Sequence, residues 1–421
     1  MHSEHIAPMP SVVLSHGGIQ YSYQMALALQ EARLLGAFYT TLYDFKRFEK
    51  FPWLQNYFSR RRYEGLNTEL VQSNPWPEIM QRALRPLTLG RASFANQLIH
   101  WRCRLFDQHV SHALERIKFD LFIGLSGSAL SSIKKTKAQG KISMIDQHDI
   151  HYSLAEKLLR EERELHPEFA SSIPYWPPLR SYLDCVKQEL DLADFILAPS
   201  SFSLQSHLDA GIPPNKLILM PHGMSSPRGN IRPSKREGGK FRILFVGTLT
   251  QRKGIKYLLE AVKQLRLSQI ELILIGDRMV NDRALAPYRD YFQYIGYVPY
   301  SKLKDYFDNA HLLILPSIFD AFGLVALDAM AAGLPVIVSE HTAAGSDIVR
   351  DGVDGFVVPI RDVEAIKKGI LNLYENENLR RQMGQSASER SKEFSWNVYA
   401  ERLKNTIERV FSVARNPSYA A

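Results

Sequence analysis

Short apolar runs alternate with longer amphipathic segments along most of the chain. The runs consist mainly of Val, Ile, Leu and Phe, with little alternation between polar and apolar positions. Strands of this kind are buried on both faces, as in parallel sheets covered by helices. The predicted strands are 12–15, 37–42, 121–125, 142–145, 195–198 and 217–220 in the first half, and 242–246, 271–275, 292–295, 312–315, 336–338 and 355–358 in the second. Repeated strand–helix units predict an α/β fold with doubly wound sheets.

One segment between the halves interrupts this alternation. Residues 225–240 (SSPRGNIRPSKREGGK) are rich in Pro, Gly and charge and have no apolar period, which is typical of a linker. We therefore expect two Rossmann-like domains, at 1–224 and 241–394. Residues 395–421 begin with a predicted helix, capped by Ser395, whose apolar positions recur at three- and four-residue steps. We expect this helix to cross back to the first domain.

Length and composition fit a globular protein with two cores. A chain of 421 residues is longer than one ordinary core supports, and its 45% hydrophobic and 23% charged residues are usual for a folded domain. No apolar run is long enough to span a bilayer, and MHSEHIAPMP lacks the features of a secretory signal. The two cysteines, Cys103 and Cys185, have no metal-ligand partners at useful spacing. We therefore expect a cytoplasmic protein with reduced thiols.

The positive charge is concentrated in one part of the chain. The net charge is +8, and residues 43–118 hold 13 Lys and Arg against seven Asp and Glu, with Arg60, Arg61 and Arg62 in succession. Aromatic residues are interleaved with these cations, a pattern that suits the surface of an anionic membrane. Alternatively, the aromatic residues form the core of extra helices and the arginines are solvated. No nucleic-acid-binding module is recognised, so we expect no nucleic acid partner.

Residues 246–262 (VGTLTQRKGIKYLLEAV) contain two cations between a predicted strand and a predicted helix. Gly247 follows the strand, and Arg252 and Lys253 stand directly before Gly254, where the helix begins. Open α/β folds bind ligands at the carboxyl edge of the sheet, and a helix N-terminus attracts anions through its free N–H groups and its dipole. Taken alone, the segment fits either a diphosphate site or a solvated Lys/Arg pair on a surface loop.

Residues 316–340 (PSIFDAFGLVALDAMAAGLPVIVSE) place two carboxylates eight positions apart at a second strand-to-helix turn. Asp320 precedes a helix that is expected to start near Phe322, and Asp328 lies about two turns further along. Gly323 has no side chain, so backbone N–H groups there can approach a ligand closely. Alternatively, Asp320 is only an N-cap and Asp328 a surface carboxylate.

The first half has weaker signals at two of its strand ends. Gly17 and Gly18 follow the first strand, in a pattern that is not G-x-G-x-x-G and so does not indicate dinucleotide binding. Residues 146–153 (DQHDIHYS) place His148 and His151 at a sheet edge, facing the predicted cleft. They lack a third clear ligand group, so we expect no metal; hydrogen-bonded structural histidines are the alternative. The charged segment LLREERELHPEF that follows predicts an exposed helix without chemistry.

Together, these motifs resemble the C-terminal domain of retaining glycosyltransferases of family 4, which have the GT-B architecture of two Rossmann-like domains facing a cleft. That family has a strand, a glycine and a short loop ending in Lys-Gly, as at 247–254. It then has Pro-Ser, an acidic residue, Phe-Gly and a second acidic residue, as at 316–328, followed by Ala-Met, Gly and Pro-Val-Ile, as at 329–337. DGVDGFVVP at 351–359 is similar as well. The resemblance covers 241–394, whereas the first half matches only at spaced landmarks.

The resemblance implies roles for the residues of both motifs. Lys253 would bind the donor diphosphate. An arginine usually follows the loop glycine in the family; Thr248 stands there in this chain, and Arg252 would replace the missing charge. The two acids of the family are usually both Glu, and here both are the shorter Asp. Asp320 would lie near the hydroxyls of the transferred sugar, and Asp328 would meet the ribose directly or through a water.

The resemblance also defines an expected set of site residues. The residues expected to take part in catalysis are Asp320, His148 and Lys253. The donor-binding residues are expected to be Gly17, Gly18, Gly247, Arg252, Lys253, Val298, Asp320, Phe322, Gly323, Leu324 and Asp328. PHGMS at 221–225 matches the interdomain hinge of the family, where Gly223 would allow unusual backbone angles.

The implied reaction is transfer of a hexose-type sugar, with retention, from a nucleoside diphosphate sugar to a glycan or lipid-linked acceptor. A UDP- or GDP-sugar is the expected donor, and neither a cofactor nor a metal is expected. The expected location is the cytoplasm or the inner face of its membrane. Two alternatives stay open: a nucleotide-sugar epimerase or phosphorylase on the same fold, and a non-catalytic membrane-associated scaffold.

Overall fold

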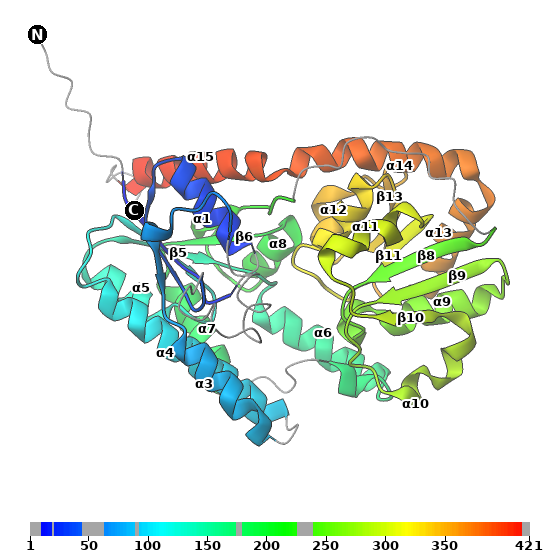
Figure 1. Cartoon of the computed structure of the whole chain (residues 1–421), viewed down its shortest axis with the longest axis horizontal. Helices are drawn as coiled ribbons and strands as arrows, with labels where there is room; N and C mark the ends of the chain where they lie inside the picture. The colour runs from blue at the N-terminus through cyan, green and yellow to red at the C-terminus, as the bar shows by residue number, and fades with distance from the viewer. Residues whose placement is uncertain are drawn as a thin grey trace, which may run out of the picture.

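The protein contains two parallel β-sheets, each packed between helices (Figure 1). The computed structural model describes residues 10–18, 21–43, 63–88, 92–173, 179–224 and 239–414. The strand orders are β3-β2-β1-β4-β5-β6-β7 in the first sheet and β10-β9-β8-β11-β12-β13 in the second. The predicted class of two doubly wound α/β domains is thereby confirmed. Arg60, Arg61, Arg62 and most of the predicted linker at 225–240 lie outside the described residues.

The first sheet is built from the strands that the apolar runs predict, with one addition. Its strands are β1 (Val12–Ser15), β2 (Leu35–Thr40), β3 (Val71–Ser73), β4 (Leu121–Leu125), β5 (Ile142–Asp146), β6 (Phe195–Ala198) and β7 (Leu217–Leu219). Its helices are α1 (Ser22–Glu31), α3 (Trp76–Leu84), α4 (Ala92–Ala113), α5 (Leu130–Ala138), α6 (Tyr152–Leu165), α7 (Arg180–Leu192) and α8 (Ser201–Asp209). Strand β3 escapes prediction because it is a short, partly buried edge strand with two polar residues, Gln72 and Ser73.

The second sheet carries the loops that hold the candidate chemistry. Its strands are β8 (Phe241–Val246), β9 (Ile270–Ile275), β10 (Gln293–Gly296), β11 (Leu312–Leu315), β12 (Val336–Ser339) and β13 (Gly355–Val358). Its helices are α9 (Ile255–Leu265), α10 (Asp282–Leu285), α11 (Tyr300–Asp308), α12 (Leu324–Ala331), α13 (Val363–Glu375) and α14 (Glu377–Ser391). Strand β8 is central and pairs in parallel with β9 and β11. The loops after β8 and β11 therefore leave the sheet side by side at its carboxyl edge.

The final helix, α15 (Trp396–Ala414), returns to the first domain, as the sequence predicts. Its start is capped by Ser395, whose Oγ accepts a hydrogen bond from the Val398 N–H at 3.3 Å. Tyr399, Leu403 and other apolar residues of this helix are buried in the core of the first domain together with residues of α1. Helices α14 and α15 follow one another along the same side of both domains (Figure 1).

Helix α6 follows a strand of the first sheet but packs into the second domain. It runs from the first domain toward α10 (Figure 1). Ile150, just before the helix, Leu158 within it and Phe169 just after it belong to the hydrophobic core of the second domain. The expectation of an exposed charged helix is wrong at Glu162, whose exposure is 0%. A charge pattern that is typical of a solvated face therefore includes a residue, Glu162, that is buried between the domains.

Gly223 allows a close approach between two segments, not an unusual backbone angle. It is absent from the glycines with positive φ, so the expectation of special angles at this position is wrong. A Cβ atom at Gly223 would lie 2.8 Å from the Cα of Trp396 and 2.7 Å from its ring. Glycine is therefore required here because the start of α15 packs directly against the backbone.

We predict that Gly223→Ala lowers the free energy of unfolding by about 1–3 kcal/mol, the usual cost of overpacking a well-packed site. Urea unfolding followed by circular dichroism measures the change. Because the added methyl group meets a backbone atom, side-chain rotation cannot relieve the clash. An unchanged unfolding free energy would contradict this account of α15 docking.

Candidate active site

The loops after β8 and β11 are in contact at Gly254, where a side chain would not fit. Gly254 has a φ of 67°, and a Cβ on it would lie 1.9 Å from the carbonyl oxygen of Pro316. The Ile318 N–H donates a hydrogen bond of 2.9 Å to the carbonyl of Arg252. The two motifs that the sequence places far apart are thus in direct backbone contact.

This contact brings together the three charged residues that the sequence singles out. The ammonium group of Lys253 forms an ion pair with Asp320 Oδ2, and Arg252 Nη1 lies 4.0 Å from Asp320 Oδ1. Burial lowers the pKa of Lys253, while Asp320 acts to raise it. Burial would also raise the pKa of Asp320, but Lys253 and Arg252 outweigh this effect and hold that pKa below its usual value. The site therefore holds a carboxylate between two cations.

The N-terminus of α12 lies directly after this charged group. Gly323, with a φ of 75°, occupies the N-cap position, so the helix begins at Leu324, two residues after Phe322, near which the start was expected. A left-handed conformation at the cap favours glycine and leaves the first N–H groups of the helix without a side-chain cap. Because these groups and the helix dipole attract negative charge, this end of α12 suits an anion next to Lys253.

Asp328 lies further along α12 and has a partner that the sequence does not reveal. Its Oδ1 accepts a hydrogen bond of 2.7 Å from the hydroxyl of Tyr300, the first residue of α11. Asp328 is buried, whereas Tyr300 is 53% exposed. Val298, two residues before Tyr300, packs against the core of the second domain. Gly247, at the end of β8, has a φ of 154° and donates its N–H to the carbonyl of Ile275.

In the first domain, the loop after β1 is fixed by a histidine that the sequence analysis does not select. The N–H of Gly18 donates a hydrogen bond of 3.1 Å to Nδ1 of His16, and Thr41 Oγ1 donates one of 2.9 Å to the carbonyl of Gly17. Burial, followed by repulsion from His148 when that ring is protonated, lowers the pKa of His16 to about 3. His16 is therefore neutral near pH 7.

His148 stands where the first domain approaches the charged group of the second. Burial lowers its pKa, so its ring is neutral near pH 7. The charge of its neighbour Asp149 is among those that act on Lys253. His222, which follows β7, stacks on Tyr21 with ring centroids 3.7 Å apart and meets Phe322 edge-on at 5.0 Å. Phe322 thus joins the site in the second domain to the sheet edge of the first.

His151 serves the fold and not the site. Its ring accepts a hydrogen bond from the Ser153 N–H and caps α6. Burial, and then the neighbouring His207, lower its pKa to about 4. The hydrogen bond fits the alternative of a structural histidine, because the ring nitrogen is used to start a helix.

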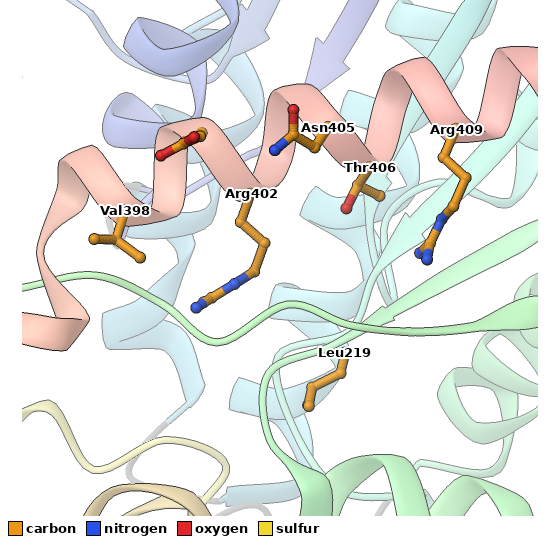
Figure 2. Close-up of a pocket in the computed structure, with 7 residues that line it drawn as sticks. Leu219, Val398, Arg402, Asn405, Thr406 and Arg409 are labelled. Carbon is orange, nitrogen blue, oxygen red and sulfur yellow. The ribbon is translucent and has the colours of Figure 1, made fainter.

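Three other features bear on the kind of site that the described residues can form. Among the described residues, no group of three or more His, Cys, Asp or Glu is arranged to hold a metal ion. In the same part of the chain, no helix is long and apolar enough to cross a membrane. A depression of about 510 Å³ lies between Leu219 and α15, on the side toward which Arg402 and Arg409 extend (Figure 2). Its lining includes no residue of the loops after β8 and β11.

Comparison with known proteins finds a family model that matches most of the second half of the chain. Residues 228–390 match the model of the family described as Glycosyl transferases group 1. An uncharacterized 41.2 kDa protein in the cps region of Klebsiella pneumoniae is 31% identical over 182 residues, 41% of this chain and 50% of that protein. The O-antigen chain mannosyltransferase B of Escherichia coli is 27% identical over 270 residues, 59% of this chain and 70% of that protein. The chain spans about half the length of the first curated relatives it matches.

Solved structures show the fold over nearly the whole chain. The structure of Anabaena Alr3699/HepE in complex with UDP matches with a TM-score of 0.63, covering 95% of this chain and 100% of that one at 16% identity. The similarity covers both domains, and therefore both parallel sheets. The chain therefore has the GT-B architecture, and its residues 228–390 match the family model of group 1 glycosyl transferases.

Proposed function

We propose that the protein is a retaining glycosyltransferase of family 4. It transfers a hexose-type sugar from a UDP- or GDP-sugar to a glycan or lipid-linked acceptor, in the biosynthesis of a surface polysaccharide or glycolipid, in the cytoplasm or at its membrane. The carrying observation is the ion pair of Lys253 and Asp320 beside Arg252 and the N-terminus of α12. Two comparisons support this proposal. One relative is an O-antigen chain mannosyltransferase, and one structural neighbour was solved in complex with UDP.

The ion pair suggests how the donor enters the site. In the structure, the carboxylate of Asp320 neutralises the charge of Lys253. A diphosphate at the start of α12 would compete for the ammonium group and release Asp320, whose carboxylate would then accept hydrogen bonds from sugar hydroxyls. Asp328, oriented by Tyr300, would accept the ribose hydroxyls. Lys253 would thereby exchange its partner Asp320 for the diphosphate of the donor.

The chemistry would be electrostatic. The bond between the anomeric carbon and the diphosphate oxygen breaks, and negative charge builds up on the leaving diphosphate. Lys253, Arg252 and the N–H groups at Gly323 and Leu324 would stabilise that charge, as preorganised donors do in other enzymes. The acceptor oxygen would form the new bond on the same face of the sugar, and its proton would pass to the leaving phosphate. The neutral ring of His148 would position the sugar from the first domain.

The donor assignment is tested with Lys253→Ala and a panel of UDP, GDP, ADP and their sugars. At least one nucleoside diphosphate should raise the melting temperature of the wild type, because a ligand that binds only the folded state stabilises it. Lys253→Ala should weaken that ligand by about 1.5–3 kcal/mol, the range for a charge-assisted hydrogen bond. Lys263→Ala, at the far end of α9, is the matched control. Undiminished affinity in an Arg252→Ala/Lys253→Ala double variant would rule out this diphosphate site.

Substitution of Asp320 and of Asp328 should affect different steps, namely sugar transfer and nucleotide binding. Asp320→Ala should reduce turnover far more than it reduces affinity for the bare nucleoside diphosphate, because Asp320 meets the sugar. Asp328→Ala should reduce nucleotide affinity itself, and Tyr300→Phe should do so more weakly, because it removes only the hydrogen bond that orients Asp328. Calorimetric titration and initial rates separate the two effects. An exchange of the two phenotypes would overturn the assignment.

A projecting pair of helices in the first domain supports a membrane-bound acceptor. Helices α3 and α4 pack against each other and lie along the lower edge of the first domain (Figure 1). Trp76 is 66% exposed and Leu87 is 73% exposed, and Met80 and Phe94 are exposed nearby. Exposed aromatic and aliphatic side chains within a strongly basic segment suit the interface of an acidic bilayer.

We predict that the protein sediments with vesicles containing acidic lipid, and that added salt weakens the binding because salt screens the attraction. A Trp76→Ser/Leu87→Ser double variant should lose most of this binding while keeping its melting temperature, because both side chains are already exposed. Val353→Ser, an exposed apolar position of the second domain, is the control. Failure of the wild type to sediment at low salt would favour a soluble acceptor.

A further inference from the structure

Glu162 places a buried carboxylate of α6 inside the second domain. Its side chain is 0% exposed. It accepts hydrogen bonds from Gln251 Nε2 at 2.6 Å, from Arg361 Nε at 2.6 Å and from the hydroxyl of Tyr257 at 3.0 Å. All three donors belong to the second domain. A buried carboxylate is tolerated only when its oxygens are satisfied, so the three donors and Glu162 depend on one another.

A second set of contacts holds the same loop through its backbone. The N–H of Gln251 donates a hydrogen bond of 2.9 Å to Ser172 Oγ, which lies just beyond α6. His166, at the end of α6, contacts the hydroxyl of Tyr257 at 2.8 Å. Gln251 is itself fully buried. Both its side chain and its backbone are therefore held by the segment that reaches across from the first domain.

Gln251 directly precedes the two cations of the candidate site. Gln251, Arg252 and Lys253 form one short helical turn, which begins after Thr250 and ends at Gly254. On the other side, the carbonyl of Arg252 is held by the N–H of Ile318. A turn that is fixed on one side by α6 and on the other by the loop after β11 has little freedom to move its side chains.

We infer that Glu162 is a positioning residue for this turn, through which the first domain fixes Arg252 and Lys253 at the place where they meet an anion. The inference rests on the proposed function in one respect, namely that these cations bind the donor diphosphate. A preorganised pair of cations pays no ordering cost when the ligand arrives. Loss of Glu162 should therefore appear as weaker diphosphate binding, beyond any effect on overall stability.

Three variants and one control separate positioning from structural support. Glu162→Ala removes the whole network, and Glu162→Gln keeps an acceptor for Gln251 and Tyr257 but loses the charge that faces Arg361. Gln251→Ala breaks only the link to the turn and leaves Glu162 with Arg361 and Tyr257. Asp354→Asn is the matched control, because Asp354 is equally buried but is held by Arg350 and Ser386.

The first measurement needs no ligand. Amide hydrogen exchange at residues 251–254 should rise at least tenfold in Glu162→Ala and in Gln251→Ala, and should stay unchanged in Asp354→Asn, because local opening increases when a segment loses its anchors. Glu162→Gln should lie between wild type and Glu162→Ala. Should Glu162→Ala fail to fold, Gln251→Ala carries the test, since it leaves no charge unpaired. Unchanged exchange in Gln251→Ala would overturn the inference.

The second measurement compares the nucleoside diphosphate that binds the wild type with the corresponding monophosphate by calorimetry. Glu162→Ala and Gln251→Ala should bind the diphosphate at least tenfold more weakly and the monophosphate within about threefold of the wild type, because the monophosphate lacks the second phosphate group that the two cations are proposed to meet. Equal losses for both nucleotides, or a lower melting temperature with unchanged diphosphate affinity, would mean that the network is merely structural. A wild type that binds no nucleoside diphosphate would instead contradict the proposed function.

Discussion

The close approach of Gly254 to Pro316 is the constraint on which the site depends. With no side chain at Gly254, the loops after β8 and β11 come within backbone contact, and only then can Lys253 reach Asp320. The same contact aligns Arg252 with the start of α12. Both loops begin at neighbouring strands of one parallel sheet, so the topology brings them to one edge and the glycine closes the remaining distance.

Much of the fold and part of the site follow from the sequence, for identifiable reasons. Apolar runs such as 121–125 are buried on both faces, so their composition alone reveals them. The cap at Ser395 and the period of α15 are local signals as well. The pairing of Lys253 with Asp320 could be predicted only from the family resemblance. Taken alone, Lys253 fits a solvated surface charge equally well, and Asp320 fits an N-cap.

The remaining features depend on contacts between distant parts of the chain. Tyr300 of α11 donates a hydrogen bond to Asp328 of α12, and the spacing of these two residues in the sequence does not predict this contact. Glu162 lies in a run of charges that has the pattern of a solvated face, and only the second domain, packed over α6, buries it. His151 takes the role of a helix cap, whereas its neighbour His148 lies close to His16 and His222.

The return of α15 to the first domain has a consequence for how the chain folds. Tyr399, Leu403 and Ile407 complete a core whose other members come from the first domain, between residues 12 and 220. During synthesis, domains generally fold as they emerge, from the N-terminus onward. Here the first domain stays without part of its core until the whole second domain has left the ribosome. The apolar residues of α1 that pack against α15 therefore wait for their partners until the end of the chain is made.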